Sequence, residues 1–428
     1  MTRVVAQAAG PLTGTVSVPG DKSIGHRALL LGALAEGTLS VRGLPGGQDV
    51  RSTRNCLEAR GVRFADDGRF VAVHGVGARG LQAPAHPLDC GNSGSTMRFL
   101  MGVLAGHEFA AELVGDASLS RRPMERVAAP LRAMGAEIKL DDGRPPVRLR
   151  GRRPLKALSY RLPVPSAQGK TAVLLAGLYA DGETTVEDPF GTRDHTERML
   201  AFLGADCGDP RGGRSAVRPG SLRSDKALSV PGDPSSAAFL AAAAVLVPGS
   251  RLSVRAVLLN PSRLGFMEAL REMGAPVSWE RGGVHGREPV GDLTAAHGAL
   301  KGLRLAAERV PELVDEVPLL AVLCACADGE SRLEGLGELR LKESDRLAGT
   351  AAGLSALGAE ARVEGDALVV RGPTRWRPGR VETMGDHRLA MAFAVAALAG
   401  GGPVELSDGD CVAVSYPSFF ADLRGLGA

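Results

Sequence analysis

The polar and apolar residues of this chain follow a pattern that recurs six times. Each copy begins with a short polar, turn-forming segment and continues into an almost wholly apolar run of helical length. A helix without a polar face must be buried on all sides, so the pattern predicts six buried helices. The copies start at Gly20, Gly91, Pro165, Gly232, Val314 and Gly385.

A second, amphipathic helix is predicted between the buried ones, and each copy ends at a glycine. Glycine readily adopts the left-handed conformation that closes a helix. These glycines are Gly61, Gly135, Gly204, Gly274, Gly358 and Gly427. Strand-like segments follow most of the buried helices, at residues 38–41, 184–187, 250–254, 331–334 and 403–406. Most amphipathic helices precede two strands joined by a turn, as at residues 62–73 and 361–370.

Six such units exceed what one hydrophobic core holds, so we expect an α/β fold of two similar domains. Each domain is predicted to contain three βαβαββ-like units with buried helices inside strands. The boundary is expected near residues 229–232, giving one domain of residues 20–229 and another of residues 1–19 with 230–428. The last unit lacks its closing strands, so we expect an N-terminal strand at residues 4–18 to complete the second domain. A Gly and Ala bias that merely mimics a repeat is disfavoured, because two helix types alternate in fixed order.

The amino-acid composition argues against several classes of function. A formal charge of +3 and 4% aromatic residues argue against nucleic-acid binding. No apolar run approaches the ~20 residues of a membrane span, and the first ten residues lack the apolar core of a signal peptide. The six cysteines are scattered without a C-x-x-C pair, which is typical of reduced thiols rather than disulfides or a zinc site. We therefore expect a cytoplasmic protein.

Cations and hydroxyls collect on the polar heads of the buried helices. The first head, P-G-D-K-S-I-G-H-R, places Lys22, Ser23 and Arg27 at a helix N-terminus, where free N–H groups already favour an anion. A cation there opposes the helix dipole, so Lys22 is better explained by function than by structure. One such terminus contributes only about 0.3–1 kcal/mol, so several heads must converge, and a cleft between the domains is the expected place.

Some alternatives stay open at this point. His26 and His195 fit structural and functional roles equally well, and Asp315 also fits simple charge complementation of a helix start. The segment Q-G-K-T at residues 168–171 resembles the end of a phosphate-binding P-loop, but Val164 stands where that motif needs its first glycine. The heads also lack G-x-G-x-x-G spacing, so a dinucleotide-binding fold is not supported.

The heads together resemble the 5-enolpyruvylshikimate-3-phosphate synthase family of enolpyruvyl transferases. The resemblance runs in order from Pro19 to the end of the chain. It is carried by P-G-D-K-S-I-G-H-R-A-L-L-L, G-N-S-G-S-T-M-R, S-A-Q-G-K-T-A, L-K-E-S-D-R-L and G-D-H-R-L-A-M-A. It implies the family's inside-out α/β barrel fold in each domain. It also implies transfer of the enolpyruvyl group of phosphoenolpyruvate to the 5-hydroxyl of shikimate 3-phosphate, with release of phosphate.

The resemblance also implies roles for individual residues, carried over by matching position. Shikimate 3-phosphate would be held by Lys22, Ser23, Arg27, Ser166, Ala167, Gln168, Arg193, Asp315 and Lys342. Phosphoenolpyruvate would be held by Lys22, Gly94, Arg122, Gln168, Arg346 and Arg388. The acid–base groups would be Lys22, Asp315 and Glu343. No metal or organic cofactor is implied, the only partners are the two small-molecule substrates, and the family is usually monomeric.

The sequence departs from the family pattern near its end. Many members carry a lysine before the terminal [S/T]-[Y/F]-P motif, whereas Val414 precedes Ser415-Tyr416-Pro417 here. The anion contact that this lysine would make is therefore missing here or is supplied by another residue. Ser95 stands where threonine is commoner. Because Gly94 keeps the small residue beside phosphoenolpyruvate, we expect glyphosate to compete with that substrate, with Phe99 as a possible modifier.

Two rival functions fit parts of the same sequence pattern. The related transferase that acts on UDP-N-acetylglucosamine shares the fold, but its first head reads K-N and it carries a reactive cysteine in a Gly-rich loop. Here Ser23 follows Lys22, and Cys324 and Cys326 lie inside an apolar run. A non-catalytic anion-binding repeat protein would need the cations but not Asp315 and Glu343 as well.

Overall fold

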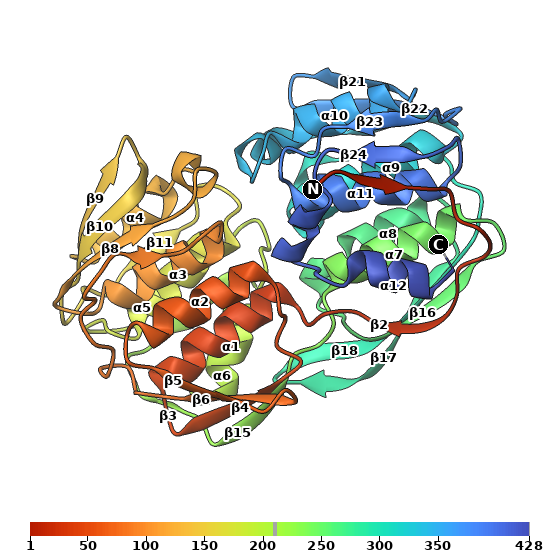
Figure 1. The fold of residues 1–428 in the computed structure, drawn as a ribbon. Helices are drawn as coiled ribbons and strands as arrows, with labels where there is room; N and C mark the ends of the chain where they lie inside the picture. Colours follow the sequence, from red (N-terminus) through yellow and green to blue (C-terminus); the bar gives the residue numbers. More distant parts are fainter. Residues whose placement is uncertain (209–211, 428) are drawn as a thin grey trace. The chain divides into compact units, whose positions relative to one another are not determined.

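The computed structural model describes residues 1–208 and 212–427 (Figure 1). The chain divides into two compact units. Unit 1 contains residues 1–19, 231–283 and 289–428, and unit 2 contains residues 20–230 and 284–288. The short segment 284–288 thus groups with unit 2 although the chain on both sides belongs to unit 1, which the sequence pattern does not predict. Ala428, the predicted end of the last repeat, lies outside the described residues.

The six apolar runs are helices, as predicted, and they form the core of each unit. They are α1 (Lys22–Leu34), α3 (Gly94–Leu104) and α5 (Ala167–Gly177) in unit 2, and α7 (Pro234–Leu246), α9 (Val317–Cys326) and α11 (His387–Leu398) in unit 1. From the second turn onward their side chains are almost all buried. Most begin at a side chain that accepts a backbone N–H, namely Asp21, Ser93, Ser166, Asp233 and Asp386. The polar heads therefore act as helix caps.

The amphipathic helices are also confirmed. They are α2 (Gln48–Glu58), α4 (Glu125–Ala133), α6 (His195–Phe202), α8 (Gly265–Glu272), α10 (Arg346–Ala356) and α12 (Phe419–Gly425). The glycine predicted to end each of them has a positive φ, from 86° at Gly61 to 104° at Gly427. A side chain with a Cβ adopts this conformation only at a cost, which explains the recurring glycine.

Among the described residues, the strands of unit 2 form three sheets and one short pair (Figure 1). In sheet order the strands are β15 (Lys226–Ser229), β4 (Thr38–Arg42), β6 (Phe70–His74) and β5 (Arg63–Asp66); β7 (Leu88–Asp89), β8 (Ala110–Val114), β10 (Arg144–Arg150) and β9 (Glu137–Asp141); β11 (Ser159–Arg161), β12 (Thr184–Glu187) and β13 (Arg214–Val217); and β14 (Leu222–Arg223) with β3 (Ala35–Glu36).

The strands of unit 1 form three further sheets. In sheet order they are β17 (Val277–His285), β18 (Glu288–Ala296), β16 (Arg251–Leu258) and β2 (Thr13–Ser17); β19 (Arg304–Leu305), β20 (Gly329–Leu333), β22 (Ala367–Gly372) and β21 (Glu360–Glu364); and β1 (Arg3–Val5), β24 (Val404–Leu406) and β23 (Gly379–Val381). Each three- or four-stranded sheet of the molecule contains one parallel pair joined to antiparallel neighbours.

In two of the parallel pairs, the two strands come from distant parts of the sequence. In the other repeats, the strand before a buried helix pairs with the strand after it, as β11 and β12 do around α5. By contrast, β2 precedes α1 but pairs with β16, and β15 precedes α7 but pairs with β4. The N-terminal segment thus lies in unit 1. It forms two strands rather than the single predicted one, because Gly10 and Pro11 interrupt it and Pro11 has no N–H for a ladder.

Candidate functional site

The cations at the head of α1 are held by contacts with three neighbouring helices, α2, α5 and α6. Lys22 Nζ lies 2.8 Å from Asp49 Oδ2 on α2. Arg27 is buried, and its guanidinium donates to the hydroxyls of Thr196 and Thr171, each at 2.7 Å. Burial lowers the pKa of Arg27 to about 10, so the side chain still carries its charge at neutral pH.

His26, which the sequence left undecided, lies in the same head and is wholly buried. Its Nδ1 is 2.7 Å from the hydroxyl of Thr53 on α2. Burial, and next the positive charge of Lys22, lowers the pKa of His26 well below its usual value. His26 is therefore a neutral packing residue that joins α1 to α2.

The heads of α3 and α5 are joined through Gln168. Its Oε1 accepts from Arg98 Nη1 at 2.5 Å, and its Nε2 donates to Ser95 Oγ at 2.9 Å. A Cβ added at Gly94 would lie 3.0 Å from Arg98 Nη1 and 3.3 Å from Arg122 Nη1. The glycine therefore leaves room for two guanidinium groups at the start of α3.

The other predicted residues of unit 2 surround these heads. Arg122 follows a 3-10 turn, η1 (Leu119–Arg121), and donates to Asn92 Oδ1 at 2.9 Å. Ser166 caps α5 by accepting from Gly169 N, and Ala167 is the first residue of that helix. Arg193 lies in the segment before α6, close enough that its charge contributes to lowering the pKa of Arg27. Through these contacts the N-termini of α1, α3 and α5 form one cationic cluster.

In unit 1, Arg346 is the centre of a second cluster. Its guanidinium is almost fully buried and contacts three carboxylates: Asp386 at 2.8 Å, Glu343 at 2.5 Å and Asp315 at 3.5 Å. Burial opposes the charge of Arg346, but Asp386, and then Glu343 and Asp315, outweigh it and raise the pKa above its usual value. Both predicted acid–base carboxylates of this unit thus share one arginine.

The remaining predicted residues of unit 1 border this cluster. Burial lowers the pKa of Lys342, and the nearby carboxylate of Asp315 offsets part of that effect. Arg388, the second residue of α11, is buried and lies 3.9 Å from Glu316. Asp315 and Glu316 form a 3-10 turn, η4 (Val314–Glu316), rather than the first turn of the helix, which begins next to Pro318.

The sequence pattern indicates neither Asp49, which pairs with Lys22, nor Asp386, which holds Arg346, as a residue of a site. Arg98 is one of the cations on the repeated heads, and the structure shows that it positions Gln168. Asp386 belongs to a head that the repeat marks, so its place in the pattern was a usable signal. Asp49 lies in an amphipathic helix, and nothing in its local sequence indicates that it faces Lys22.

A buried cluster of three charged side chains supports the head of α5. Lys170 Nζ lies 3.0 Å from both Asp188 Oδ2 and Glu197 Oε1, and its neighbour Thr192 donates to Asp188. Burial works against these charges, but the attraction of Glu197, and then of Asp188, raises the pKa of Lys170, and the attraction of Lys170 lowers the pKa of Asp188. Lys170 is thus a structural cation in the motif that resembles a P-loop.

These shifts predict a pH dependence of stability. Because the pKa of Asp188 is depressed in the folded state, its contribution is present above the unfolded value of about 3.9 and is lost as pH falls through the folded value. Because the pKa of Lys170 is raised, its contribution is lost only as pH rises above about 10.4. We expect Asp188→Asn to lower the free energy of unfolding at pH 7 by about 1–3 kcal/mol. In urea titrations the difference from wild type should shrink below pH 4; a constant difference would contradict this.

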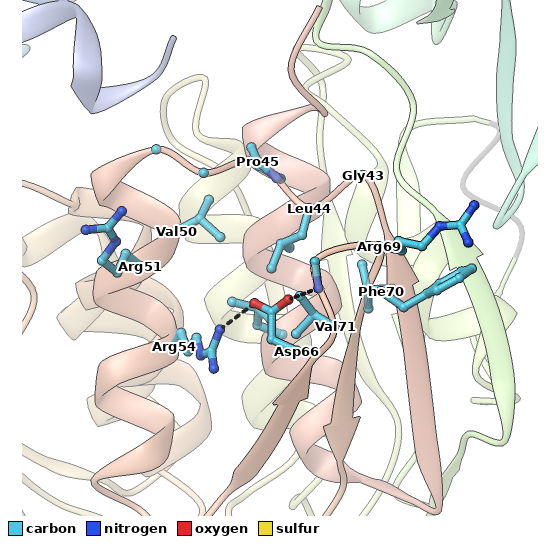
Figure 2. Close-up of a pocket in the computed structure, with 15 residues that line it drawn as sticks. Gly43, Leu44, Pro45, Val50, Arg51, Arg54, Asp66, Arg69, Phe70 and Val71 are labelled. Carbon is cyan, nitrogen blue, oxygen red and sulfur yellow. Dashed lines mark hydrogen bonds and ion pairs between the residues drawn. The ribbon is translucent and has the colours of Figure 1, made fainter. Parts of the chain in front are cut away.

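A cavity of about 380 Å³ lies elsewhere in unit 2 (Figure 2). It is lined by the segment 43–47, one side of α2 and the turn between β5 and β6. None of the residues predicted for substrate binding lines it.

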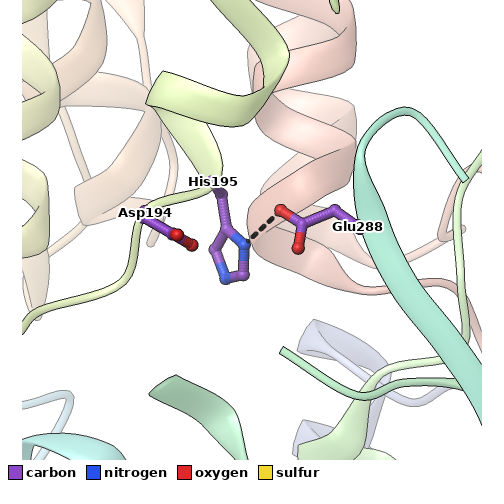
Figure 3. Close-up of side chains that lie close together, drawn as sticks. All are labelled: Asp194, His195 and Glu288. Carbon is purple, nitrogen blue, oxygen red and sulfur yellow. Dashed lines mark hydrogen bonds and ion pairs between the residues drawn. The ribbon is translucent and has the colours of Figure 1, made fainter. Parts of the chain in front are cut away.

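A third group of polar side chains surrounds His195, at the start of α6 (Figure 3). His195 Nδ1 lies 2.8 Å from Glu288 Oε1, and both side chains are buried. Asp194 completes a set whose potential ligand atoms lie within 4.8 Å of one another. However, Arg198 Nε is 2.9 Å from both oxygens of Asp194 and 3.7 Å from Glu288. This guanidinium already supplies the positive charge, so the group fits a metal poorly and instead holds the segment 284–288 in unit 2.

Comparisons with known proteins agree over nearly the whole chain. A 3-phosphoshikimate 1-carboxyvinyltransferase of Acidithiobacillus ferrooxidans is 49% identical over 420 residues, covering 98% of this chain and 96% of the relative. One of Rhodospirillum rubrum is 47% identical over 430 residues, covering 98% and 95%.

Solved structures give the same result. EPSP synthase of Acinetobacter baumannii matches with a TM-score of 0.88 and 40% identity, covering 100% of this chain and 98% of that one. The enolpyruvyl transferase NikO of Streptomyces tendae has a TM-score of 0.80 at 21% identity and shares the fold. Residues 6–423 match the protein-family model described as EPSP synthase (3-phosphoshikimate 1-carboxyvinyltransferase). The chain therefore belongs to the EPSP synthase family.

Proposed function

We propose that this protein transfers the enolpyruvyl group of phosphoenolpyruvate to the 5-hydroxyl of shikimate 3-phosphate, in the shikimate pathway to aromatic amino acids. The main support from the structure is the Arg346 cluster, which places Glu343 and Asp315 on one buried guanidinium. A merely anion-binding protein needs no carboxylates there. Family membership over nearly the full chain supports the same activity.

Shikimate 3-phosphate is proposed to bind mainly the cationic cluster of unit 2. Lys22, Ser23, Arg27, Ser166, Ala167, Gln168 and Arg193 supply charges and hydrogen-bonding groups there, and Asp315 and Lys342 would add contacts from unit 1. Arg27 is held by two threonine hydroxyls and so is already oriented. A fixed guanidinium loses little side-chain freedom on binding an anion.

Phosphoenolpyruvate carries a carboxylate and a phosphate, and planar guanidinium groups match both. We assign its binding to Lys22, Gly94, Arg122, Gln168, Arg346 and Arg388. The close approach of Arg98 and Arg122 to Gly94 supports this assignment, because a side chain at that position would occupy the space beside both groups. Binding there also places substrate next to Lys22, whose present partner is Asp49.

The proposed chemistry is addition followed by elimination. Asp315 orients or deprotonates the 5-hydroxyl, whose oxygen forms a bond to C2 of phosphoenolpyruvate while Glu343 delivers a proton to C3. In the tetrahedral intermediate, the C2–O bond to phosphate then breaks, and the proton on C3 returns to Glu343. Lys22 assists as acid or base beside the leaving phosphate. Proton transfer of this kind contributes about 10²–10⁴-fold per group, and orientation and charge stabilisation supply the rest.

The proposal also covers the location, oligomeric state and cofactor use of the enzyme. None of the helices among the described residues is long and apolar enough to cross a membrane. We propose that the enzyme acts in the cytoplasm as a monomer and uses no metal or organic cofactor. Sedimentation of the purified chain would test the monomer.

The test of the function is phosphate release from phosphoenolpyruvate with two acceptors offered separately. Release with shikimate 3-phosphate and not with UDP-N-acetylglucosamine is the expected result. Release only with the nucleotide sugar would assign the chain to the sister activity. Tight binding of shikimate 3-phosphate without release under either condition would indicate a binding protein.

We expect glyphosate to inhibit phosphate release in competition with phosphoenolpyruvate. Glyphosate resembles the bound substrate in carrying a carboxylate and a phosphonate, the two groups that guanidinium forks bind. Inhibition should weaken as phosphoenolpyruvate is raised at fixed shikimate 3-phosphate. Turnover that is unchanged at high glyphosate would contradict this prediction.

Gly94→Ala is expected to raise KM for phosphoenolpyruvate by about tenfold and to leave KM for shikimate 3-phosphate nearly unchanged. The added Cβ lies 3.0 Å from Arg98 Nη1, so the guanidinium must shift by a few tenths of an ångström. A shift of this size weakens charge-assisted hydrogen bonds worth about 1.5–3 kcal/mol each. Steady-state kinetics with each substrate varied would check it, with Gly46→Ala as the control, because a Cβ at Gly46 meets nothing within 4 Å. Equal changes in both KM values would contradict the assignment of Gly94 to the phosphoenolpyruvate site.

A further inference from the structure

His195, whose role the sequence leaves open, lies next to a residue that holds a proposed substrate-binding group. It is the first residue of α6, and the following residue, Thr196, accepts a hydrogen bond from Arg27 Nε at 2.7 Å. The side chains of all three residues are buried. Because consecutive residues of a helix share one backbone of fixed geometry, the position of His195 constrains the hydroxyl that holds Arg27.

Two threonine hydroxyls fix the orientation of the Arg27 guanidinium. Nε donates to Thr196 and Nη2 donates to Thr171, and the two hydroxyl oxygens lie 2.7 Å apart. Nη1 donates in addition to Ser23 O at 2.9 Å. A guanidinium is planar and its donors have a fixed arrangement, so these contacts also set the direction of the N–H groups that are left for an anion. Thr196 is the member of this group that α6 contributes.

The position of the His195 ring is in turn fixed by Glu288, toward which it points in Figure 3. Its Nδ1 lies 2.8 Å from Glu288 Oε1, and the two side chains are 0% and 4% exposed. An ionised carboxylate only accepts hydrogen bonds, so Nδ1 carries a proton and donates. Nε2 has no hydrogen-bond partner among the described residues. Within that part of the chain, Glu288 is therefore the group that orients the imidazole.

Glu288 itself follows a tight turn that α6 holds at a second point. The two residues between β17 and β18, Gly286 and Arg287, have φ values of 55° and 71°. Positive φ at both central positions is typical of a type I′ turn, whose shape the flanking strands fix. Arg198 of α6 donates from Nη1 to Arg287 O at 2.8 Å. The first two turns of α6 thus contact this hairpin turn through His195 and Arg198.

We propose that His195 and Glu288 are positioning residues for the binding of shikimate 3-phosphate. Their contact fixes the start of α6, and the position of Thr196 then orients Arg27. Neither His195 nor Glu288 has to touch the substrate for this effect. The inference rests on the proposed function, in which Arg27 binds shikimate 3-phosphate.

An electrostatic role of Glu288 predicts the opposite effect. Burial is the main cause that lowers the pKa of Arg27 to about 10, and the negative charge of Glu288 is close enough to oppose this effect. A negative charge beside a cationic site weakens the binding of an anion, so removal of the charge alone would tighten the binding of shikimate 3-phosphate. Loss of positioning would weaken it. The sign of the change therefore distinguishes the two roles.

The test is titration calorimetry of the full chain with shikimate 3-phosphate, together with steady-state kinetics. Glu288→Ala removes the acceptor and should raise Kd and KM for shikimate 3-phosphate by about tenfold, with kcat and KM for phosphoenolpyruvate changed by less than about threefold. Glu288→Gln keeps an oxygen that accepts from Nδ1, so its Kd should stay within about threefold of wild type. Thr196→Val removes the hydroxyl that holds Arg27 and should reproduce the effect of Glu288→Ala.

A matched pair of variants at His195 tests the same contact from the other side. His195→Asn places an amide N–H close to the position of Nδ1, and its Kd for shikimate 3-phosphate should stay within about threefold of wild type. His195→Gln places the amide near the position of Nε2 and should weaken binding as Glu288→Ala does. This pair keeps the proposal testable if Glu288→Ala does not fold, which circular dichroism would show.

Glu187→Ala is the control, because it removes a carboxylate of unit 2 that is 52% exposed and lies 2.9 Å from Arg161. It should bind shikimate 3-phosphate as wild type does. Tighter binding in both Glu288 variants would show an electrostatic role, and equal changes in the KM of both substrates would show a general distortion; either result overturns the proposal. Weaker binding in Thr196→Val alone would overturn it too, while leaving the role of Arg27 intact. A wild-type chain that does not bind shikimate 3-phosphate would instead reject the proposed function, and this inference with it.

Discussion

Glu343→Gln is expected to lower kcat for phosphate release by about 10²–10⁴-fold, the usual contribution of a general acid–base group. Glutamine has nearly the shape of glutamate and can still accept a hydrogen bond from Arg346, but it cannot take a proton from carbon and return it. Because Asp386 and Asp315 remain on Arg346, the cluster should keep its geometry. The loss should therefore appear in kcat, with KM for shikimate 3-phosphate changed by less than about threefold.

Rapid-quench measurement of phosphate release would separate the chemical step from product release. Glu334→Gln is the matched control, because it makes the same substitution at an exposed position whose partner is Arg332 at 3.1 Å. It should have the kinetics of wild type. A Glu343→Gln enzyme with near-normal kcat would exclude Glu343 as the group that moves the proton and would leave Asp315 or Lys22 for that step.

Arg346→Met is expected to destabilise the protein by about 3–5 kcal/mol, the cost of removing one partner from a buried ionic cluster. Arg346 is 1% exposed and lies between three carboxylates. Methionine fills most of the space, but among the described residues it leaves the wholly buried Asp386 with the Ser344 hydroxyl and the backbone N–H of Arg388 as its hydrogen-bond donors. Repulsion between the remaining carboxylates adds to the loss.

Denaturant unfolding followed by circular dichroism would measure the change, because its midpoint reports the free energy of unfolding when the slope is unaltered. Arg340→Met is the control: Arg340 is 37% exposed and lies 3.4 Å from both Asp345 and Asp366, a surface arrangement that contributes at most about 1 kcal/mol. If Arg346→Met is as stable as Arg340→Met, the Arg346 cluster contributes to substrate binding and not to stability.

The helices and most strands follow from local sequence because their signals are local. An apolar run such as that of α7 can only be a buried helix, and a glycine such as Gly61 ends its helix wherever that helix packs. The family motifs are likewise contiguous, so the sequence identifies Lys22, Gln168 and Glu343 without any knowledge of their contacts. Their proposed roles come from the resemblance.

Contacts between residues that lie far apart in the sequence could not be predicted from local patterns. Lys22 and Asp49, or Arg27 and Thr196, are joined only because separate helices meet, and their local sequences are compatible with many other neighbours. The same holds for Glu288, which pairs with His195 because the tip of a hairpin of unit 1 groups with unit 2. The cavity beside α2 was equally invisible, because its residues come from a helix, a loop and a hairpin that each look like ordinary surface.

The sequence by itself thus determined the six repeats, the two helix types and the family, because periodicity, capping residues and contiguous motifs are properties of neighbouring residues. Tertiary structure alone decided which charges are compensated. Arg346 proved to be surrounded by Asp386, Glu343 and Asp315, whereas Arg51 and Arg69 have no ionic partner among the described residues. The physical reason is that the state of a charge depends on burial and on groups within a few ångströms, and folding brings those groups from any point of the chain.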